Sequence, residues 1–193
     1  MSFPLKLLGA VLALLPALAQ GADVERTGGP YVPTPPIVVE AMLKLAGVGP
    51  ADYVIDLGSG DGRIVLMAAT KFKARGKGVD IDPDLVERAN ASARKLGVAD
   101  RAKFEVQDVL KADIGRATVM TLYLLPGMMV SLQQKLLAEL KPGTRIVSHD
   151  FTFDKWKPDR TVTVETQEKY EMTGLWSSDV HLWIVPGPAQ GAR

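Results

Sequence analysis

The chain of 193 residues contains no cysteine, and its only histidines are His149 and His181. The lack of cysteine excludes disulfide bridges, thiol nucleophiles and cysteine-ligated metals. The two histidines also lack the i, i+4 spacing of a helical zinc pair, so we predict that the protein has no metal site.

The chain also lacks an excess of basic residues. It has 23 Lys and Arg against 22 Asp and Glu, for a net charge of +1. Removing residues 1–19 takes away one lysine (23 − 1 = 22) and no acid, which brings the net charge to zero. Proteins that bind nucleic acid usually carry a basic excess, so we expect no nucleic-acid partner.

The N-terminus has its own pattern. Lys6 is the only charge before an apolar run over residues 7–18, and the run ends in Ala17-Leu18-Ala19. This order is typical of a secretory signal peptide, and the run is shorter than the roughly 20 apolar residues that span a bilayer. We expect residues 1–19 to be a cleaved signal and the protein to be exported, periplasmic or secreted. The alternative is an uncleaved membrane anchor, through which the chain would contact a membrane.

The remainder is predicted to be one α/β domain over residues 37–187. Residues 20–36 form an irregular lead-in, and residues 188–193 form a frayed tail. Strands are expected over residues 53–57, 76–81, 102–106, 119–125, 144–148, 161–166 and 180–185, and helices over residues 37–45, 63–72, 83–96 and 128–140. The alternation predicts a mostly parallel sheet with helices on both sides. No helix is expected between the last two strands, which are therefore predicted to be an antiparallel pair.

A glycine-rich loop, Asp56-Leu57-Gly58-Ser59-Gly60-Asp61-Gly62, follows the first strand. Such a loop places backbone N–H groups at a helix N-terminus, where a ligand can approach closely. Its spacing differs from the G-x-G-x-x-G dinucleotide pattern. Asp56 and Asp61 would repel a pyrophosphate but suit a cationic amino group such as that of a methionine moiety. The loop therefore predicts S-adenosylmethionine (SAM) as the cofactor, with an NAD-type site as the weaker alternative.

Three further residues follow the next two strands at the same edge of the sheet. Asp80 lies a little over 20 residues beyond the loop, where an acid can accept hydrogen bonds from both ribose hydroxyls. Ile81 is predicted to pack on the adenine face, and Asp108 to accept a hydrogen bond from the adenine amino group. Each aspartate has a plainer alternative as a helix cap.

With these motifs in place, the chain resembles the class I SAM-dependent methyltransferases. That resemblance implies a Rossmann-like seven-stranded sheet, mostly parallel, with an antiparallel C-terminal hairpin strand. The chain also has a narrower resemblance, to the FAM173-type (Dot1-like) protein lysine methyltransferases and their bacterial relatives. It rests on Tyr31-Val32-Pro33-Thr34-Pro35, on Leu57 to Ile64, on Tyr123 to Met129 and on residues 151–156.

The narrower resemblance implies that Tyr31 and Thr34 close over SAM, and that Tyr123 lies near the methyl group and the substrate. His149, after the fifth strand, is a tentative second catalytic residue that could orient or deprotonate a nucleophile. The alternatives are a core or rim tyrosine and a structural histidine. The three tryptophans are expected to pack in the fold rather than to form a cation cage.

These features predict a SAM-dependent methyltransferase whose acceptor is a protein lysine. The alternatives are a small-molecule acceptor and a SAM- or nucleotide-binding protein without transfer activity. We expect the protein to be a monomer.

Overall fold

The computed structural model describes residues 30–187. The predicted signal peptide and C-terminal tail lie outside this part of the chain. Within it, no helix is both long and apolar enough to cross a membrane.

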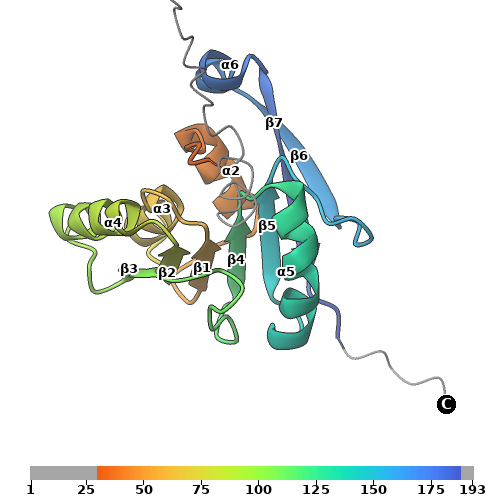
Figure 1. The fold of residues 1–193 in the computed structure, drawn as a ribbon, viewed down its shortest axis with the longest axis horizontal. Helices are drawn as coiled ribbons and strands as arrows, with labels where there is room; N and C mark the ends of the chain where they lie inside the picture. Colours follow the sequence, from red (N-terminus) through yellow and green to blue (C-terminus); the bar gives the residue numbers. More distant parts are fainter. Residues whose placement is uncertain (1–29, 188–193) are drawn as a thin grey trace, which may run out of the picture.

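A seven-stranded sheet forms the centre of the molecule, in the order β3-β2-β1-β4-β5-β7-β6 (Figure 1). Strands β1 to β5 are parallel to one another, whereas β7 is antiparallel to both β5 and β6. The strands are β1 (Tyr53–Leu57), β2 (Arg75–Asp80), β3 (Ala102–Val106), β4 (Val119–Leu122), β5 (Arg145–His149), β6 (Arg160–Glu165) and β7 (Ser177–Ile184). The predicted fold class, including the antiparallel C-terminal pair, is confirmed.

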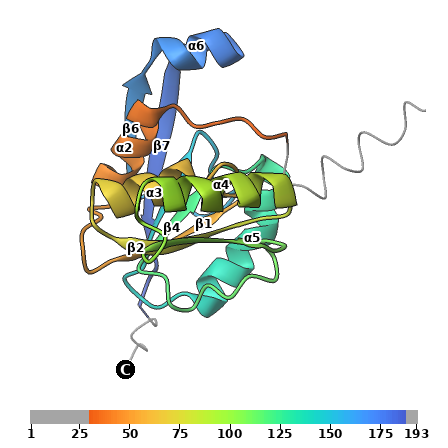
Figure 2. The same ribbon diagram turned by 90° about the vertical axis from the view of Figure 1, so that its left-hand side faces the viewer.

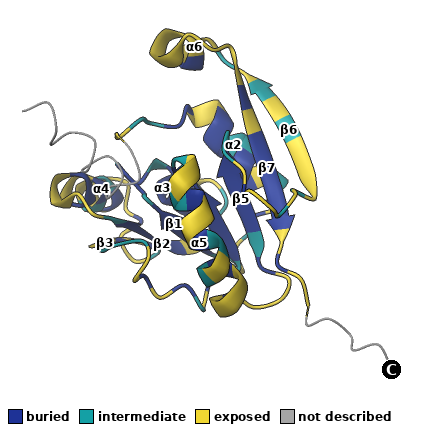
Figure 3. Ribbon diagram, turned by 45° about the vertical axis from the view of Figure 1, so that its right-hand side comes forward, coloured by how far each residue is buried: buried dark blue, intermediate teal, exposed yellow. Residues whose placement is uncertain are grey.

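Helices cover the sheet on both faces (Figure 2). The covering helices are α2 (Pro36–Leu45), α3 (Arg63–Thr70), α4 (Pro83–Lys95) and α5 (Pro126–Glu139). A further short helix, α6 (Gln167–Thr173), lies at the end of the β6–β7 hairpin (Figure 3). Helices α2, α3 and α4 pack on one face, and α5 packs on the other through Met129, Leu132 and Leu136. Because β4 is covered on both sides, all four of its residues are buried, as its apolar sequence predicts.

Local signals in the sequence set several helix boundaries. Helix α4 begins at Pro83 after the cap Asp82, whose carboxylate accepts hydrogen bonds from the backbone N–H groups of Asp84 and Leu85. Gly97, at φ +67°, follows its end in the left-handed conformation that glycine adopts without strain.

Several predictions about the elements are wrong. Strand β7 begins at Ser177 rather than at residue 180, and α5 begins at Pro126 rather than at residue 128. Strand β4 ends at Leu122 rather than at residue 125, since the chain leaves the sheet at Tyr123 and enters α5 at Pro126. A helix, α6, does separate β6 from β7. It has only seven residues, most of them polar, so it shows no apolar periodicity in the sequence; Gly174, at φ +76°, ends it.

Candidate functional site

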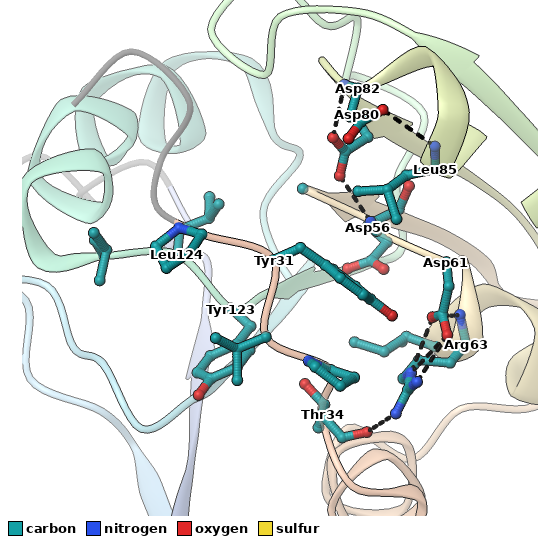
Figure 4. Close-up of a pocket in the computed structure, with 18 of the residues that line it drawn as sticks. Tyr31, Thr34, Asp56, Asp61, Arg63, Asp80, Asp82, Leu85, Tyr123 and Leu124 are labelled. Carbon is teal, nitrogen blue, oxygen red and sulfur yellow. Dashed lines mark hydrogen bonds and ion pairs between the residues drawn. The ribbon is translucent and has the colours of Figure 1, made fainter. Parts of the chain in front are cut away.

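A cavity of about 430 Å³ opens at the carboxyl ends of the parallel strands (Figure 4). This edge is where open α/β sheets bind their ligands. The lead-in before α2, the loops after β1, β2 and β4, and single residues of the C-terminal part surround it. The predicted site residues that line it are Tyr31, Thr34, Asp56, Gly58, Ser59, Gly60, Asp61, Asp80, Ile81 and Tyr123.

The glycine loop has a backbone that other residues would strain. Gly58, Gly60 and Gly62 all have positive φ, at +77°, +53° and +82°. A Cβ atom at Gly60 would lie 2.6 Å from the ring of Tyr31, and one at Gly58 would lie 2.7 Å from Leu124. These glycines therefore leave a cradle between the loop and the opposite wall, of the kind that a cofactor needs for close backbone approach.

Gly62 has a different position from the other two glycines, because it does not line the cavity. A Cβ atom there would lie 2.6 Å from the ring of Phe104 and 2.8 Å from Ala89. Its predicted part in cofactor binding is thus indirect: it lets α4 and β3 pack closely against the start of α3.

Asp80 ends β2 beside the loop. Its carboxylate accepts hydrogen bonds from the backbone N–H of Gly60, at 2.7 Å, and from that of Asp82, at 3.0 Å. Asp108 does not line the main cavity. It borders a smaller adjoining recess together with Gly58, Ile81 and Leu124. The predicted ribose and adenine partners therefore lie in sequence along one continuous edge, which fits an adenosyl group.

The two acids of the loop differ in their electrostatics. The carboxyl of Asp56 is buried and accepts a hydrogen bond from the Thr121 hydroxyl at 2.6 Å. Burial, with smaller contributions from Asp80 and Asp61, raises its pKa to about 7. Burial would also raise the pKa of Asp61, but hydrogen bonds and the charge of Arg63 outweigh it and lower that pKa. Asp61 is therefore already paired with the cationic Arg63. Asp56, the other predicted partner for a cationic amino group, has no such pairing within residues 30–187.

Arg63 is a functional residue that the sequence reasoning missed. Its guanidinium pairs with Asp61 at 2.7 Å and donates a hydrogen bond to the backbone carbonyl of Thr34 at 2.8 Å. It thereby fastens the lead-in to the glycine loop, with the Tyr31 side chain over the cavity (Figure 4). Its position just after the loop motif is a signal that could have indicated this role.

The opposite wall of the cavity is aromatic and apolar. Tyr123 and Phe151 line it, with their ring centroids 6.1 Å apart, and the buried Leu124 lies between the two recesses. Burial, then the charge of Asp150, raises the pKa of the Tyr123 phenol. The sequence indicated Tyr123 because it follows a strand, and it included Phe151 in a segment that resembles the narrower family without giving it a role. It gave no indication of Thr173.

His149 does not reach the cavity. It is 1% exposed, its Nδ1 lies 3.2 Å from the Thr34 hydroxyl, and its Nε2 lies 2.8 Å from the Ser178 hydroxyl. Its ring is 4.0 Å from that of Tyr123, and burial lowers its pKa to about 4. The geometry therefore places His149 behind Tyr123 as a positioning residue, without the direct contact with substrate that a catalytic role would require.

The tryptophans follow the predicted packing role in two cases of three. Trp156 and Trp183 pack around Phe153, whereas Trp176 is exposed and stacks on Tyr170 with ring centroids 4.4 Å apart. Over residues 30–187, no three acidic or histidine side chains gather in a way that could hold a metal ion.

Comparison with known proteins agrees with this geometry. Residues 56–160 match the model of the ANTKMT methyltransferase domain. A protein-lysine N-methyltransferase of Saccharolobus islandicus is 44% identical over 81% of this chain and 93% of its own length. The mouse adenine nucleotide translocase lysine N-methyltransferase is 34% identical over 79% of this chain, which spans 63% of that relative.

A solved structure gives the cofactor. The crystal structure of an RNA methyltransferase from Salinibacter ruber, in complex with S-adenosyl-L-homocysteine, is 46% identical with a TM-score of 0.73 and covers 83% of this chain and 98% of its own. The cradle, the acid at the end of β2 and the adjoining recess fit the adenosyl and methionine parts of the related SAM. The chain therefore belongs to the family of the ANTKMT methyltransferase domain and is a SAM-dependent methyltransferase.

Proposed function

We propose that the methyl acceptor is the side-chain amine of a protein lysine. The observation that carries this proposal is the 44% identity, over 93% of its length, to a protein-lysine N-methyltransferase. The mouse relative, whose name gives a lysine of a specific protein as its target, supports the same acceptor chemistry.

The aromatic wall suits such an acceptor. SAM, when bound, supplies an electrophilic methyl group, and the lysine amine must meet it uncharged. A lysine has a pKa of about 10.4 in water, and burial in an apolar site lowers it. The half-buried rings of Tyr123 and Phe151 line the cavity and exclude water from the acceptor. Desolvation at this wall favours the neutral amine.

The same wall orients the amine. Proximity and orientation of the reacting groups supply about 7–11 kcal/mol in well-aligned reactions. Tyr123 is fixed from behind by the ring of His149, whose two nitrogens are held by Thr34 and Ser178. Since His149 uses both nitrogens within the fold, proton removal falls to solvent before the amine enters the desolvated site.

RNA is a second candidate acceptor, because the Salinibacter ruber protein is called an RNA methyltransferase and is 46% identical. The chain has little attraction for phosphates, with 23 basic against 22 acidic residues. A protein acceptor therefore fits its charge better.

We further propose that the protein is exported, on the strength of the signal-like residues 1–19. Cell fractionation with N-terminal sequencing of the purified protein tests this. A mature N-terminus near residue 20 in an extracytoplasmic fraction supports it, and an intact Met1 in the cytoplasm contradicts it.

The acceptor is tested by incubating the purified protein with methyl-labelled SAM and an extract of the source cells. The proposal is supported if protease releases the label and ribonuclease does not. After hydrolysis, the label should also co-migrate with methyl-lysine. Label released by ribonuclease, or found in a small molecule, contradicts it. The variant Asp80→Ala, which removes the expected ribose contact, is the matched negative control.

A further inference from the structure

Helix α6 and the turn after it carry an exposed apolar surface, which we call the α6 face. It consists of Tyr170 and Trp176, whose ring centroids lie 4.4 Å apart, and of the neighbouring Leu175, with exposed fractions of 44%, 56% and 60%. Figure 3 shows α6 as a mostly exposed element at the end of the β6–β7 hairpin. Large apolar side chains gathered in this way on a protein surface mark interaction sites.

The α6 face is fastened to the body of the protein by a partly buried ion pair. The Lys169 side chain, 4% exposed, meets both carboxylate oxygens of Asp150 at 2.8 and 2.7 Å. Asp150 also accepts a hydrogen bond from the backbone N–H of Asp179. This pair holds α6 against the carboxyl end of β5, so the face has a fixed position relative to the site.

That position borders the acceptor wall. Thr173, in the last turn of α6, lines the cavity together with Phe151, the residue after Asp150. A chain lying on the α6 face would thus lead directly to the place where Tyr123 and Phe151 receive the amine.

The charge around the α6 face has one sign. Exposed acids lie on α6 at Glu168 and Glu171, at the end of β6 at Glu165 and near the start of β7 at Asp179. The only basic residue between positions 161 and 179 is Lys169, which is buried against Asp150. Among the ion pairs of residues 30–187, none engages these four carboxylates. The face therefore combines an apolar centre with an unneutralised acidic rim.

We propose that the α6 face is the docking surface for the protein substrate, and that it selects a segment in which the target lysine is flanked by apolar and basic residues. The apolar side chains of that segment pack on Tyr170 and Trp176, and its basic residues meet the acidic rim. This inference rests on the proposed lysine methylation and adds the chemistry of the sequence around the lysine.

The test uses four short synthetic peptides, each with a single central lysine. Their flanking residues are leucine with arginine, serine with arginine, leucine with glutamate, or serine with glutamate. We expect kcat/KM for the leucine–arginine peptide to exceed that for each of the others by about tenfold, the scale of one good interface anchor.

Two variants assign that preference to the α6 face. Trp176→Ala should raise KM for the leucine–arginine peptide about tenfold, with kcat and the Kd for SAM unchanged. Glu168→Lys combined with Glu171→Lys should remove the preference for arginine over glutamate flanks. The matched controls, Leu137→Ala on α5 and Glu87→Lys on α4, change similarly exposed residues elsewhere and should leave both preferences intact.

The outcomes separate the two proposals. No methylation of any peptide contradicts the lysine acceptor itself. Equal methylation of all four peptides, or preferences that survive in the α6 variants, leaves lysine methylation standing and contradicts the docking surface.

A binding measurement checks the same surface without catalysis. Trp176 is the most exposed of the three tryptophans, so a bound leucine–arginine peptide should shift its emission to the blue, and Trp176→Tyr should abolish the shift. A shift caused by vesicles of phosphatidylcholine with an anionic phospholipid, and not by the peptide, would assign the face to a membrane and overturn the proposal.

Discussion

The two halves of the sheet are built in different ways. In the half formed by β1, β2 and β3, which we call the donor half, short-range backbone geometry makes the site. Its main contacts join the glycine loop to Asp80, 20 positions away. In the acceptor half, formed by β4, β5, β7, β6 and α6, side chains join distant parts of the chain, as Thr34 joins His149 across 115 positions.

Each half also buries an ionisable group, which is an acid in the donor half and a histidine in the acceptor half. The donor half buries Asp56, whose pKa is raised to about 7, and the acceptor half buries His149, whose pKa is lowered to about 4. Burial disfavours the charged form in both cases. The glycine loop and Asp80 of the donor half therefore depend mainly on local sequence, whereas His149 in the acceptor half depends on a polar network that only the complete fold assembles.

The largest expected effect breaks that network. Lys169→Met leaves the Asp150 carboxylate without its cation and should lower the free energy of unfolding by about 3 kcal/mol. Urea denaturation measures it, and the Kd for SAM should change less than twofold because the donor half is untouched. Lys135→Met, which removes one partner of a surface pair with Glu139, is the control and should cost less than about 1 kcal/mol.

A second substitution sharpens this result. Asp150 has φ +60°, a conformation that asparagine tolerates well. Adding Asp150→Asn to Lys169→Met removes the unpaired charge and should recover part of the lost stability. A double variant that is less stable than Lys169→Met would refute the ion-pair explanation.

The next prediction concerns folding stability, which should depend on pH in opposite directions through Asp56 in the donor half and His149 in the acceptor half. Since the pKa of Asp56 is raised on folding, its contribution to stability is lost as the pH rises from about 4 to about 7. Since the pKa of His149 is lowered, its contribution is lost as the pH falls from about 6.5 to about 4. Each change should be on the order of 3 kcal/mol.

Two variants isolate these slopes. Relative to the unsubstituted protein, Asp56→Asn should gain stability as the pH rises through its window, and His149→Asn should gain stability as the pH falls through its own. Thermal unfolding across the pH range measures both. Parallel curves for Asp56→Asn and the unsubstituted protein would show that Asp56 has no raised pKa.

The third prediction concerns the donor half alone. Asp80→Ala removes the expected ribose partner and the acceptor for the Gly60 N–H, and should weaken SAM binding about 100-fold, as expected for hydrogen bonds to a charged group. Isothermal calorimetry measures the change. Asp82→Ala, two residues away, removes the cap of α4 and should lower stability by about 1 kcal/mol with a much smaller effect on SAM. Equal losses of affinity in both variants would contradict the ribose assignment.

The contrast between the halves explains what the sequence could predict. The seven strands, the glycine loop and Asp80 were predicted because each depends on a run of neighbouring residues: apolar strands, glycines with positive φ, and an acid at a strand end. Arg63 was missed although it is adjacent to the loop, because its hydrogen bond to the Thr34 carbonyl joins residues 29 positions apart.

The acceptor half could be predicted only in part. Tyr123 followed from its place at a strand end, but the burial of His149 depends on Thr34 and Ser178, which are far away in sequence. Helix α6 was missed because its seven residues show no apolar periodicity, and its stability depends on the tertiary contact of Lys169 with Asp150.

The smallest expected effect lies where the halves meet. Thr34 joins them, because its carbonyl accepts a hydrogen bond from Arg63 and its hydroxyl contacts His149. Thr34→Val keeps the shape and the carbonyl but removes the hydroxyl, which should cost about 1 kcal/mol of stability.

Thr34 also lines the SAM cavity. If the same loss of about 1 kcal/mol is felt in the cofactor site, the Kd for SAM should rise about fivefold. Thr144→Val is the matched control: that threonine is equally buried and hydrogen-bonded, at 3.2 Å to the Ala117 carbonyl, but lies at the amino end of β5. It should lose similar stability and bind SAM normally. If Thr34→Val also bound SAM normally, the acceptor network would be structurally adjacent to the cofactor site but energetically independent of it.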